Sequence, residues 1–187
     1  MVGAPVYPPQ PPGLWHQTGR GEPVYHVDEG PDRYRRGVYV IWRRVAPYRS
    51  FVNFDAPDRT RCIVTRSRTN TPMQALTLLN DEAYVEMAHA LAARIVTEDF
   101  ADDEARIVRA FGMCVARMPA AEEVAILQQL LDEQRQRFSE VPEDVARLKK
   151  NGRLPKAVNK SENVAEWTAW FCVANTLLNL DETINKE

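Results

Sequence analysis

Residues 162–179, ENVAEWTAWFCVANTLLN, decide the fold of this chain. Coiled into a helix, this stretch presents apolar side chains in almost every direction. A helix that is apolar all round is buried by its neighbours on every side. We therefore predict that residues 162–179 form the central, buried helix. Its apolar positions are Val164, Trp167, Trp170, Phe171, Val173, Ala174, Leu177 and Leu178.

Three further segments space their apolar residues three and four positions apart, as a helix with one buried face does. We expect these helices at residues 81–98, 103–117 and 120–138, and a short helix at residues 142–150. The inward residues are predicted to be Tyr84, Met87, Ala88, Leu91 and Ile95 in the first, Ile107, Phe111, Cys114 and Val115 in the second, and Val124, Leu127, Leu131 and Phe138 in the third. The fold is therefore expected to be mainly α, an irregular helical bundle.

A shorter helix should begin within RTNTPMQALTLLND, residues 68–81. Thr71 is followed by Pro72 and, three positions after the threonine, by Gln74. This is the pattern of a capping box with proline at the first helical position, in which the two polar side chains satisfy each other's backbone amides. We predict that Thr71 is the N-cap of this helix.

Two asparagines are expected to end helices. Asn80 lies in TLLND, and Asn179 lies in the near-repeat TLLNLD. Asparagine tolerates the left-handed backbone that closes many helices, and the acidic residues that follow suit the positive end of a new helix. The repeat therefore indicates that two helices end in the same way, and it does not indicate a duplicated domain.

Residues 1–32 are predicted to be an extended proline-rich arm, because YPPQPPG at residues 7–13 removes backbone donors and disfavours helix. Residues 33–187 are expected to form a single helical domain, the C-terminal part of a larger protein. Within it, the apolar spacing of residues 34–46 predicts a helix, although VYVIW has strand propensity. Residues 47–65 are predicted to be a long structured loop with turn chemistry.

Charge is unevenly distributed along the chain. The net charge is −2, but residues 31–70 hold ten arginines and three aspartates, so they carry +7 and the remainder carries −9. Such asymmetry is found at nucleic-acid sites. Every basic residue in this segment is arginine, however, which suits planar pairing with carboxylates of the same fold. We therefore expect no nucleic-acid partner. No apolar run approaches the ~20 residues of a membrane span, so no span is expected.

The side chains that ligate soft metals are scattered, and no CxxC or CxxCH pattern is present. They are Cys62, Cys114, Cys172, His16, His26 and His89. Zinc and covalently attached haem both need closely spaced ligands. The sequence therefore predicts no metal site and no haem attachment in this chain, and it leaves the redox state of the cysteines open.

Six polar residues are candidates for a site that binds an anionic group: Asp55, Asp58, Arg59, Arg66, Arg68 and Asn70. Arginine holds an oxyanion with two parallel hydrogen bonds, and an aspartate can act as a general base if burial raises its pKa. In one hypothesis, four of them bind the anion in an active site that oxidises or cleaves a sugar derivative: Arg66, Arg68, Asp58 and Asn70. In the structural alternative, which we favour, Asn70 and Thr71 cap a helix, the aspartates make turns, and the arginines pair with helix carboxylates.

Six stretches resemble, in the same order, a C-terminal domain of unknown function that is common in planctomycetes and related bacteria, family 1553. They are YPPQPPGLW (7–15), YRRGVYVIWRR (34–44), FDAPDR (54–59), RTNTPMQALTLLND (68–81), ARMPAAEE (116–123) and AEWTAWFCVANTLLNLDE (165–182). The pattern of arginine followed by TNTP-x-QAL-x-LLND is the most specific. The departures from the family pattern are small; for example, the family often has leucine where Met73 stands.

The resemblance implies the tail of a longer, exported protein with a cytochrome-c-like domain upstream. It implies a periplasmic or cell-envelope location, although the first residues lack a signal-peptide pattern. Haem c is expected in the upstream domain. The implied partners are the upstream domains, and polysaccharide or another envelope protein. The family supplies no catalytic residues to carry over. We therefore expect an accessory or interaction module, and leave open whether it belongs to an enzyme.

Overall fold

The computed structural model describes residues 3–10, 13, 25–44, 46–151 and 164–185. By their internal contacts the residues fall into two compact units, unit 1 (Met1–Thr77) and unit 2 (Leu78–Glu187), and each is described by itself. The described residues are mainly helical, and their β structure is limited to one isolated bridge. The prediction of a mainly α chain is confirmed.

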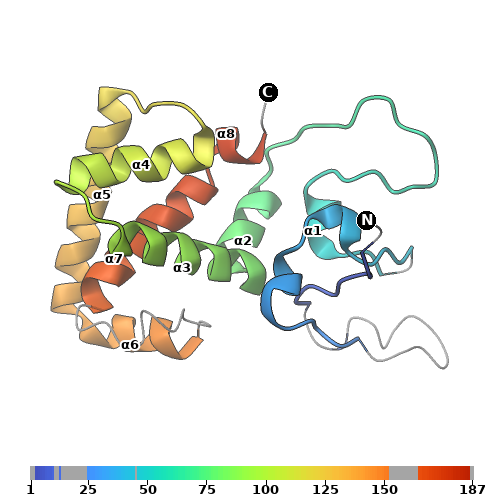
Figure 1. Cartoon of the computed structure of the whole chain (residues 1–187), viewed down its shortest axis with the longest axis horizontal. Coiled ribbons are helices and arrows are strands. Elements are labelled where there is room, and N and C mark those ends of the chain that lie inside the picture. Colours follow the sequence, from blue (N-terminus) through green and yellow to red (C-terminus); the bar gives the residue numbers. More distant parts are fainter. Residues whose placement is uncertain (1–2, 11–12, 14–24, 45, 152–163, 186–187) are drawn as a thin grey trace. The chain divides into compact units, whose positions relative to one another are not determined.

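Helix α7 (Val164–Leu178) is the centre of unit 2 (Figure 1). Trp167, Trp170 and Leu177 on this helix are at most 1% exposed. The helices that pack against it are α3 (Glu82–Thr97), α4 (Asp103–Val115), α5 (Ala121–Glu140) and α6 (Pro142–Asn151). The predicted central helix is therefore confirmed, except that residues 162–163 lie outside the described residues.

The predicted inward faces of α4 and α5 are confirmed. The buried residues shared by prediction and structure are Ile107, Phe111, Cys114, Leu127, Leu131 and Phe138. Val115 and Val124 are partly buried against the same core. Apolar spacing locates these faces well because both helices cover the core along one side only.

Helix α3 is rotated relative to its predicted face. Met87, predicted inward, is 38% exposed, and two other members of that face are only partly buried. His89, which was not predicted to be inward, is 1% exposed. Its imidazole stacks against the rings of Trp167 and Phe171, with centroids 4.8 and 4.0 Å away. Stacking on two aromatic rings gives this polar residue a place in the core.

The joint between two helices at residues 80–82 lies where it was expected, but its geometry differs from the prediction. Helix α2 (Pro72–Asn80) runs through Asn80, and α3 follows at once. Asp81 separates them with an extended backbone, and its carboxylate accepts a hydrogen bond from the amide of Ala83 at 3.0 Å. The helix therefore ends because Asp81 caps its successor.

The left-handed stops expected at Asn80 and Asn179 are not formed. Among the described non-glycine residues, positive φ angles occur at Asp55, Arg59 and Ala116. After α7, the amide of Asn179 donates to the carbonyl of Thr176 at 3.0 Å, so a tighter final turn closes the helix before α8 (Asp181–Ile184).

The helix predicted for residues 34–46 is wrong. Short 3-10 helices occupy Gly30–Tyr34 and Gly37–Tyr39, and the backbone is extended at Val40. Val6 and Val40 form a parallel bridge, in which the Val6 amide donates to the Tyr39 carbonyl at 2.9 Å. The strand propensity of this segment prevails because a partner from the N-terminal residues supplies the backbone hydrogen bonds.

Unit 1 has a small core of its own. Val6, Val40 and Tyr48 are buried together, with Phe51 packed against them. Phe51 lies on helix α1 (Arg49–Asn53), a short helix within the predicted loop 47–65. The predicted boundary at residue 32 stays a prediction, and part of the proline-rich arm, residues 1–2, 11–12 and 14–24, lies outside the described residues.

Candidate site: an arginine-lined hollow in unit 1

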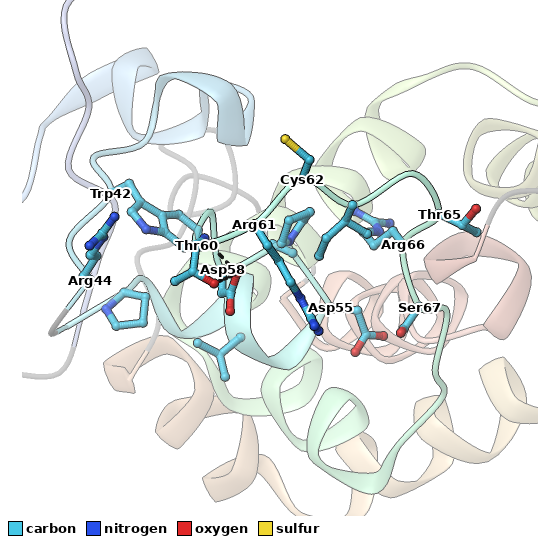
Figure 2. Close-up of a pocket in the computed structure, with 15 residues that line it drawn as sticks. Trp42, Arg44, Asp55, Asp58, Thr60, Arg61, Cys62, Thr65, Arg66 and Ser67 are labelled. Atoms are coloured by element: carbon cyan, nitrogen blue, oxygen red, sulfur yellow. Dashed lines mark hydrogen bonds between the residues drawn. The ribbon is translucent and has the colours of Figure 1, made fainter.

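A hollow of about 710 Å³ lies on unit 1 between the end of α1 and the loop that follows it (Figure 2). Its polar and aromatic lining includes Trp42, Arg44, Asp55, Asp58, Thr60, Arg61, Cys62 and Arg66. We call residues 57–68 the arginine loop, because every one of them is exposed and four are arginines. In Figure 1 the loop is part of the long teal segment between α1 and α2.

The base of the arginine loop is closed by a chain of hydrogen bonds. The Asp55 carboxylate accepts bonds from the amide and the hydroxyl of Thr69, at 3.0 and 2.6 Å. The Gln74 amide donates to the same hydroxyl at 3.0 Å. Asp55 adopts a left-handed backbone, with φ of 56°, that turns the chain out of α1. Asp55 therefore holds the two ends of the loop together.

Gln74 links this closure to helix α2. The side-chain oxygen of Gln74 accepts a hydrogen bond from the backbone amide of Thr71 at 2.8 Å. The backbone amide of Gln74 donates to the Thr71 hydroxyl at 3.3 Å. These are the two reciprocal bonds of a capping box. Gln74 is 1% exposed. The TNTP-x-Q pattern therefore fixes the start of a helix and, through Thr69, the end of the arginine loop.

Asp58 is exposed at the start of the arginine loop. It accepts hydrogen bonds from the amide of Thr60 at 3.0 Å and from the hydroxyl of Thr60 at 2.9 Å. These bonds hold the pKa of Asp58 below its usual value, with smaller contributions from the charges of Arg61 and Arg44. A carboxyl group with a lowered pKa stays ionised and is a weak proton acceptor, so this environment does not favour Asp58 as a general base.

Three guanidinium groups line the hollow, those of Arg44, Arg61 and Arg66, and all three residues are exposed. Within the described residues, none of them forms an ion pair with a carboxylate. Arg59 is adjacent: its guanidinium lies over the ring of Trp42, with the carbon 4.8 Å from the ring centroid. A positively charged wall with an aromatic surface therefore surrounds the hollow.

The structure brings some of the six candidate residues together and separates others. Asp55, Asp58 and Arg66 line the hollow, and Arg59 contacts its aromatic wall. Arg68 and Asn70 are exposed outside the lining. For Arg66 and Arg68, the expected pairing with helix carboxylates is not found in the described part of the chain.

Sequence reasoning missed the residues that complete the hollow. Arg44 and Trp42 come from the extended segment that was predicted as a helix, so their position depends on the error at 34–46. Arg61 belongs to the same arginine-rich stretch as Arg59 and Arg66, and the repeated arginines were a signal that should have included it.

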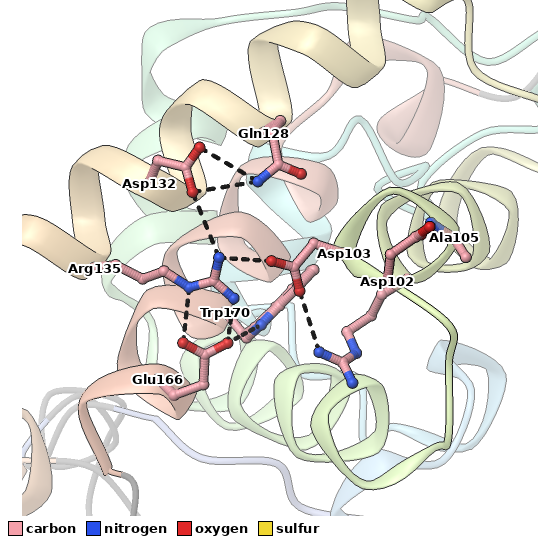
Figure 3. A network of polar contacts seen from close by, with 9 residues as sticks. Asp102, Asp103, Ala105, Gln128, Asp132, Arg135, Glu166 and Trp170 are labelled. Carbon is pink, nitrogen blue, oxygen red and sulfur yellow. Dashed lines mark hydrogen bonds and ion pairs between the residues drawn. The ribbon is translucent and has the colours of Figure 1, made fainter.

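A polar network in unit 2 joins three helices (Figure 3). Arg135 on α5 donates to both oxygens of Glu166 on α7, at 2.8 and 2.5 Å, and to Asp103 on α4 at 2.6 Å. The indole of Trp170 donates to Glu166 at 2.9 Å. The Arg135 and Glu166 side chains are 30% and 23% exposed. Asp103 also pairs with Arg106 at 3.3 Å, so each carboxylate of the network contacts a guanidinium, which favours the packing of the three helices.

The cysteines and histidines gather into no metal-ligand cluster in the described residues. Cys62, Cys114 and Cys172 form no disulfide in the described residues, and burial raises the pKa of the Cys172 thiol to about 11. Burial lowers the pKa of His89 to about 4. No helix in the described part of the chain has the length and apolar character to cross a membrane.

Comparison with protein families gives one match. Residues 1–131 fit a family described as "PSD1: Protein of unknown function (DUF1553)". The chain belongs to this family. The match includes all of unit 1 and ends within α5, so the hollow lies inside the family's matched region and the whole of α7 lies beyond it. No curated protein and no solved structure matches the chain.

Proposed function

We propose that this chain is an accessory binding module, and that unit 1 binds an oxyanion such as a carboxylate or a sulfate in its hollow. The observation that carries the proposal is the state of three arginines. Arg44, Arg61 and Arg66 face the hollow, are exposed, and form no ion pair within the described residues. A guanidinium that is not engaged in an ion pair offers paired N–H donors to an external anion.

The same geometry favours binding over chemistry at this site. Oxidation or cleavage of a sugar derivative needs a group that accepts a proton at the reacting atom. The two aspartates of the hollow are used otherwise: Asp55 closes the loop base through Thr69, and Asp58 is held ionised by Thr60. We therefore keep the enzymatic reading as the second hypothesis and base the proposal on recognition.

The setting of the module is also a proposal, and it rests on family resemblance. We infer a longer exported protein in the periplasm or cell envelope, with haem c in a domain upstream of this chain. The upstream domains would then be its constant partners, and polysaccharide or another envelope protein would be a further partner. Purification of the natural full-length protein with a c-type haem absorbance would support this setting, and a full-length protein without haem would contradict it.

The binding proposal is tested by titration with inorganic sulfate and with a sulfated oligosaccharide, followed by tryptophan fluorescence. Trp42 lines the hollow, so its emission should change on binding, and the change should vanish in Trp42→Phe. A charge-assisted hydrogen bond contributes about 1.5 kcal/mol or more, so Arg61→Gln and Arg66→Gln should each weaken binding about tenfold.

The matched control is Arg36→Gln, which removes an exposed arginine of unit 1 outside the lining of the hollow. It should leave the affinity unchanged. Equal affinities for the wild type and the Arg61→Gln/Arg66→Gln double variant would contradict the proposal, as would a wild-type protein that binds neither anion.

A further inference from the structure

The arginine loop combines positive charge with exposed aliphatic side chains. Val64 is 103% exposed, and its neighbour Ile63 is 42% exposed. Arg61 and Arg66 flank this pair in the sequence, and Arg59 and Arg68 lie further out on either side. Single exposed apolar residues are common on protein surfaces. A fully exposed valine in the middle of an arginine-rich loop is the feature that needs an explanation.

The hollow and the middle of the arginine loop differ in their chemistry. Ile63 contributes to the lining of the hollow, whereas Val64 does not, so the Val64 side chain points to solvent without a place in unit 1. Only one acidic residue, Asp58, lies within the arginine loop, and Thr60 already binds it. The loop therefore presents four positive charges around an aliphatic centre, with little negative charge to oppose them.

The loop is also held in place at its base. The Asp55–Thr69–Gln74 bonds fix both ends, so the exposed residues between them project from a closed base. Ordering the ends in advance lowers the entropy that the loop loses on binding. A clamped loop with an aliphatic centre and a basic rim is suited to insertion into a soft, anionic surface.

We propose that the arginine loop docks on an anionic phospholipid surface, with Val64 and Ile63 entering the interfacial region and the flanking arginines binding headgroup phosphates. This inference rests on the proposed function, because the oxyanion bound by the arginines is then a lipid phosphate. Charge complementarity selects anionic lipid, since basic side chains near such a surface are attracted to it. A water-soluble polysaccharide would use the arginines equally well but would leave an exposed valine unused.

The experiment measures co-sedimentation of the full chain with vesicles of phosphatidylglycerol and phosphatidylcholine, and with vesicles of phosphatidylcholine alone. The wild type should bind the anionic vesicles and not the neutral ones. Val64→Ser should weaken vesicle binding about tenfold, because a buried valine contributes about that factor. Arg61→Gln and Arg66→Gln should each weaken it about fivefold, and Val64→Trp should strengthen it.

Val38→Ser is the matched control, since Val38 is 71% exposed, belongs to the same unit and lies outside the loop. It should bind vesicles like the wild type. Val64→Ser should also bind inorganic sulfate like the wild type, and this separates the two proposals. Failure of the wild type to bind anionic vesicles, or equal binding by Val64→Ser and Val38→Ser, would overturn the lipid proposal.

If the lipid proposal fails in either way but the wild type still binds sulfate, the proposed function stays intact and the arginine loop binds a soluble anion. Tight binding of a sulfated polysaccharide that is unaffected by Val64→Ser, together with no vesicle binding, would identify polysaccharide as the partner and overturn lipid docking. Loss of both sulfate and vesicle binding in the Arg61→Gln/Arg66→Gln variant, with Val64→Ser affecting vesicles alone, is the pattern that supports both.

Discussion

His89 should make unit 2 sensitive to mild acid. The imidazole is 1% exposed and stacks on Trp167 and Phe171, and burial lowers its pKa from 6.5 to about 4. Its Nδ1 atom has no hydrogen-bond partner among the described residues. The folded state therefore keeps His89 neutral, whereas the unfolded chain protonates it below a pH of about 6.5.

The sign and size of the effect follow from proton linkage. Between the two pKa values the unfolded state binds more protons, so the free energy of unfolding is fully retained above a pH of about 6.5 and falls as the pH is lowered towards about 4. A difference of 2.5 pKa units corresponds to about 3 kcal/mol in total. About 2 kcal/mol of this should already be lost at a pH of about 5.

The assay is urea unfolding followed by helical circular dichroism, at pH values of about 7 and about 5. His89→Phe keeps an aromatic ring beside Trp167 and Phe171 but cannot titrate, so it should lose about 2 kcal/mol less than the wild type between these pH values. His26→Phe, the same change at an exposed histidine, should behave like the wild type. Equal losses in the wild type and His89→Phe would refute the reasoning.

Three further outcomes test other contacts. Thr69→Val removes the hydroxyl that joins Asp55 to Gln74, and should destabilise unit 1 by about 1–3 kcal/mol. The destabilisation should appear as faster tryptic cleavage within the arginine loop. An unchanged cleavage rate would count against the role of these hydrogen bonds in closing the loop. Arg135→Met removes the guanidinium that contacts both Glu166 and Asp103, which are partly buried, and should lower the unfolding free energy of unit 2 by about 1–3 kcal/mol, a value reduced by their partial exposure. Arg135→Lys should recover only part of the lost unfolding free energy. Full recovery would show that the paired hydrogen bonds of the guanidinium are unimportant. Asp81→Ala removes the cap of α3 and should cost about 1 kcal/mol in thermal or urea unfolding, whereas no change would mean that the joint does not depend on this carboxylate.

Local patterns predicted the parts of the fold that depend on nearby residues. The apolar circumference of α7 identified the central helix, and the spacing in α4 and α5 identified their buried faces. The capping box of Thr71 and Gln74 could be predicted from the sequence because both of its hydrogen bonds join residues three positions apart. In each case the physical cause and its signal lie within a few turns of one helix.

Distant partners explain what the sequence did not reveal. The segment after Tyr39 is extended because Val6 bonds to it, and that partner lies more than thirty positions earlier. His89 is buried because Trp167 and Phe171 offer ring surfaces from another helix.

The candidate site was predicted in part for the same reason. Asp55 and Asp58 were correctly placed in turns, but only the folded loop shows that Asp55 reaches Thr69 and that Arg44 faces the same hollow as Arg66. Arginine content indicated charge, yet it could not indicate which guanidinium groups would remain without carboxylates. That depends on where the acidic residues of the fold come to lie.

The central claim is that the arginines of the hollow bind an external oxyanion. The most direct measurement follows the NMR signals of the arginine side-chain Nε–H groups during titration with inorganic sulfate. The signals of Arg61 and Arg66 should shift and saturate, while that of Arg94, which is already paired with Glu98 on unit 2, should stay in place. Shifts of Arg61 and Arg66 no larger than that of Arg94 would contradict the account.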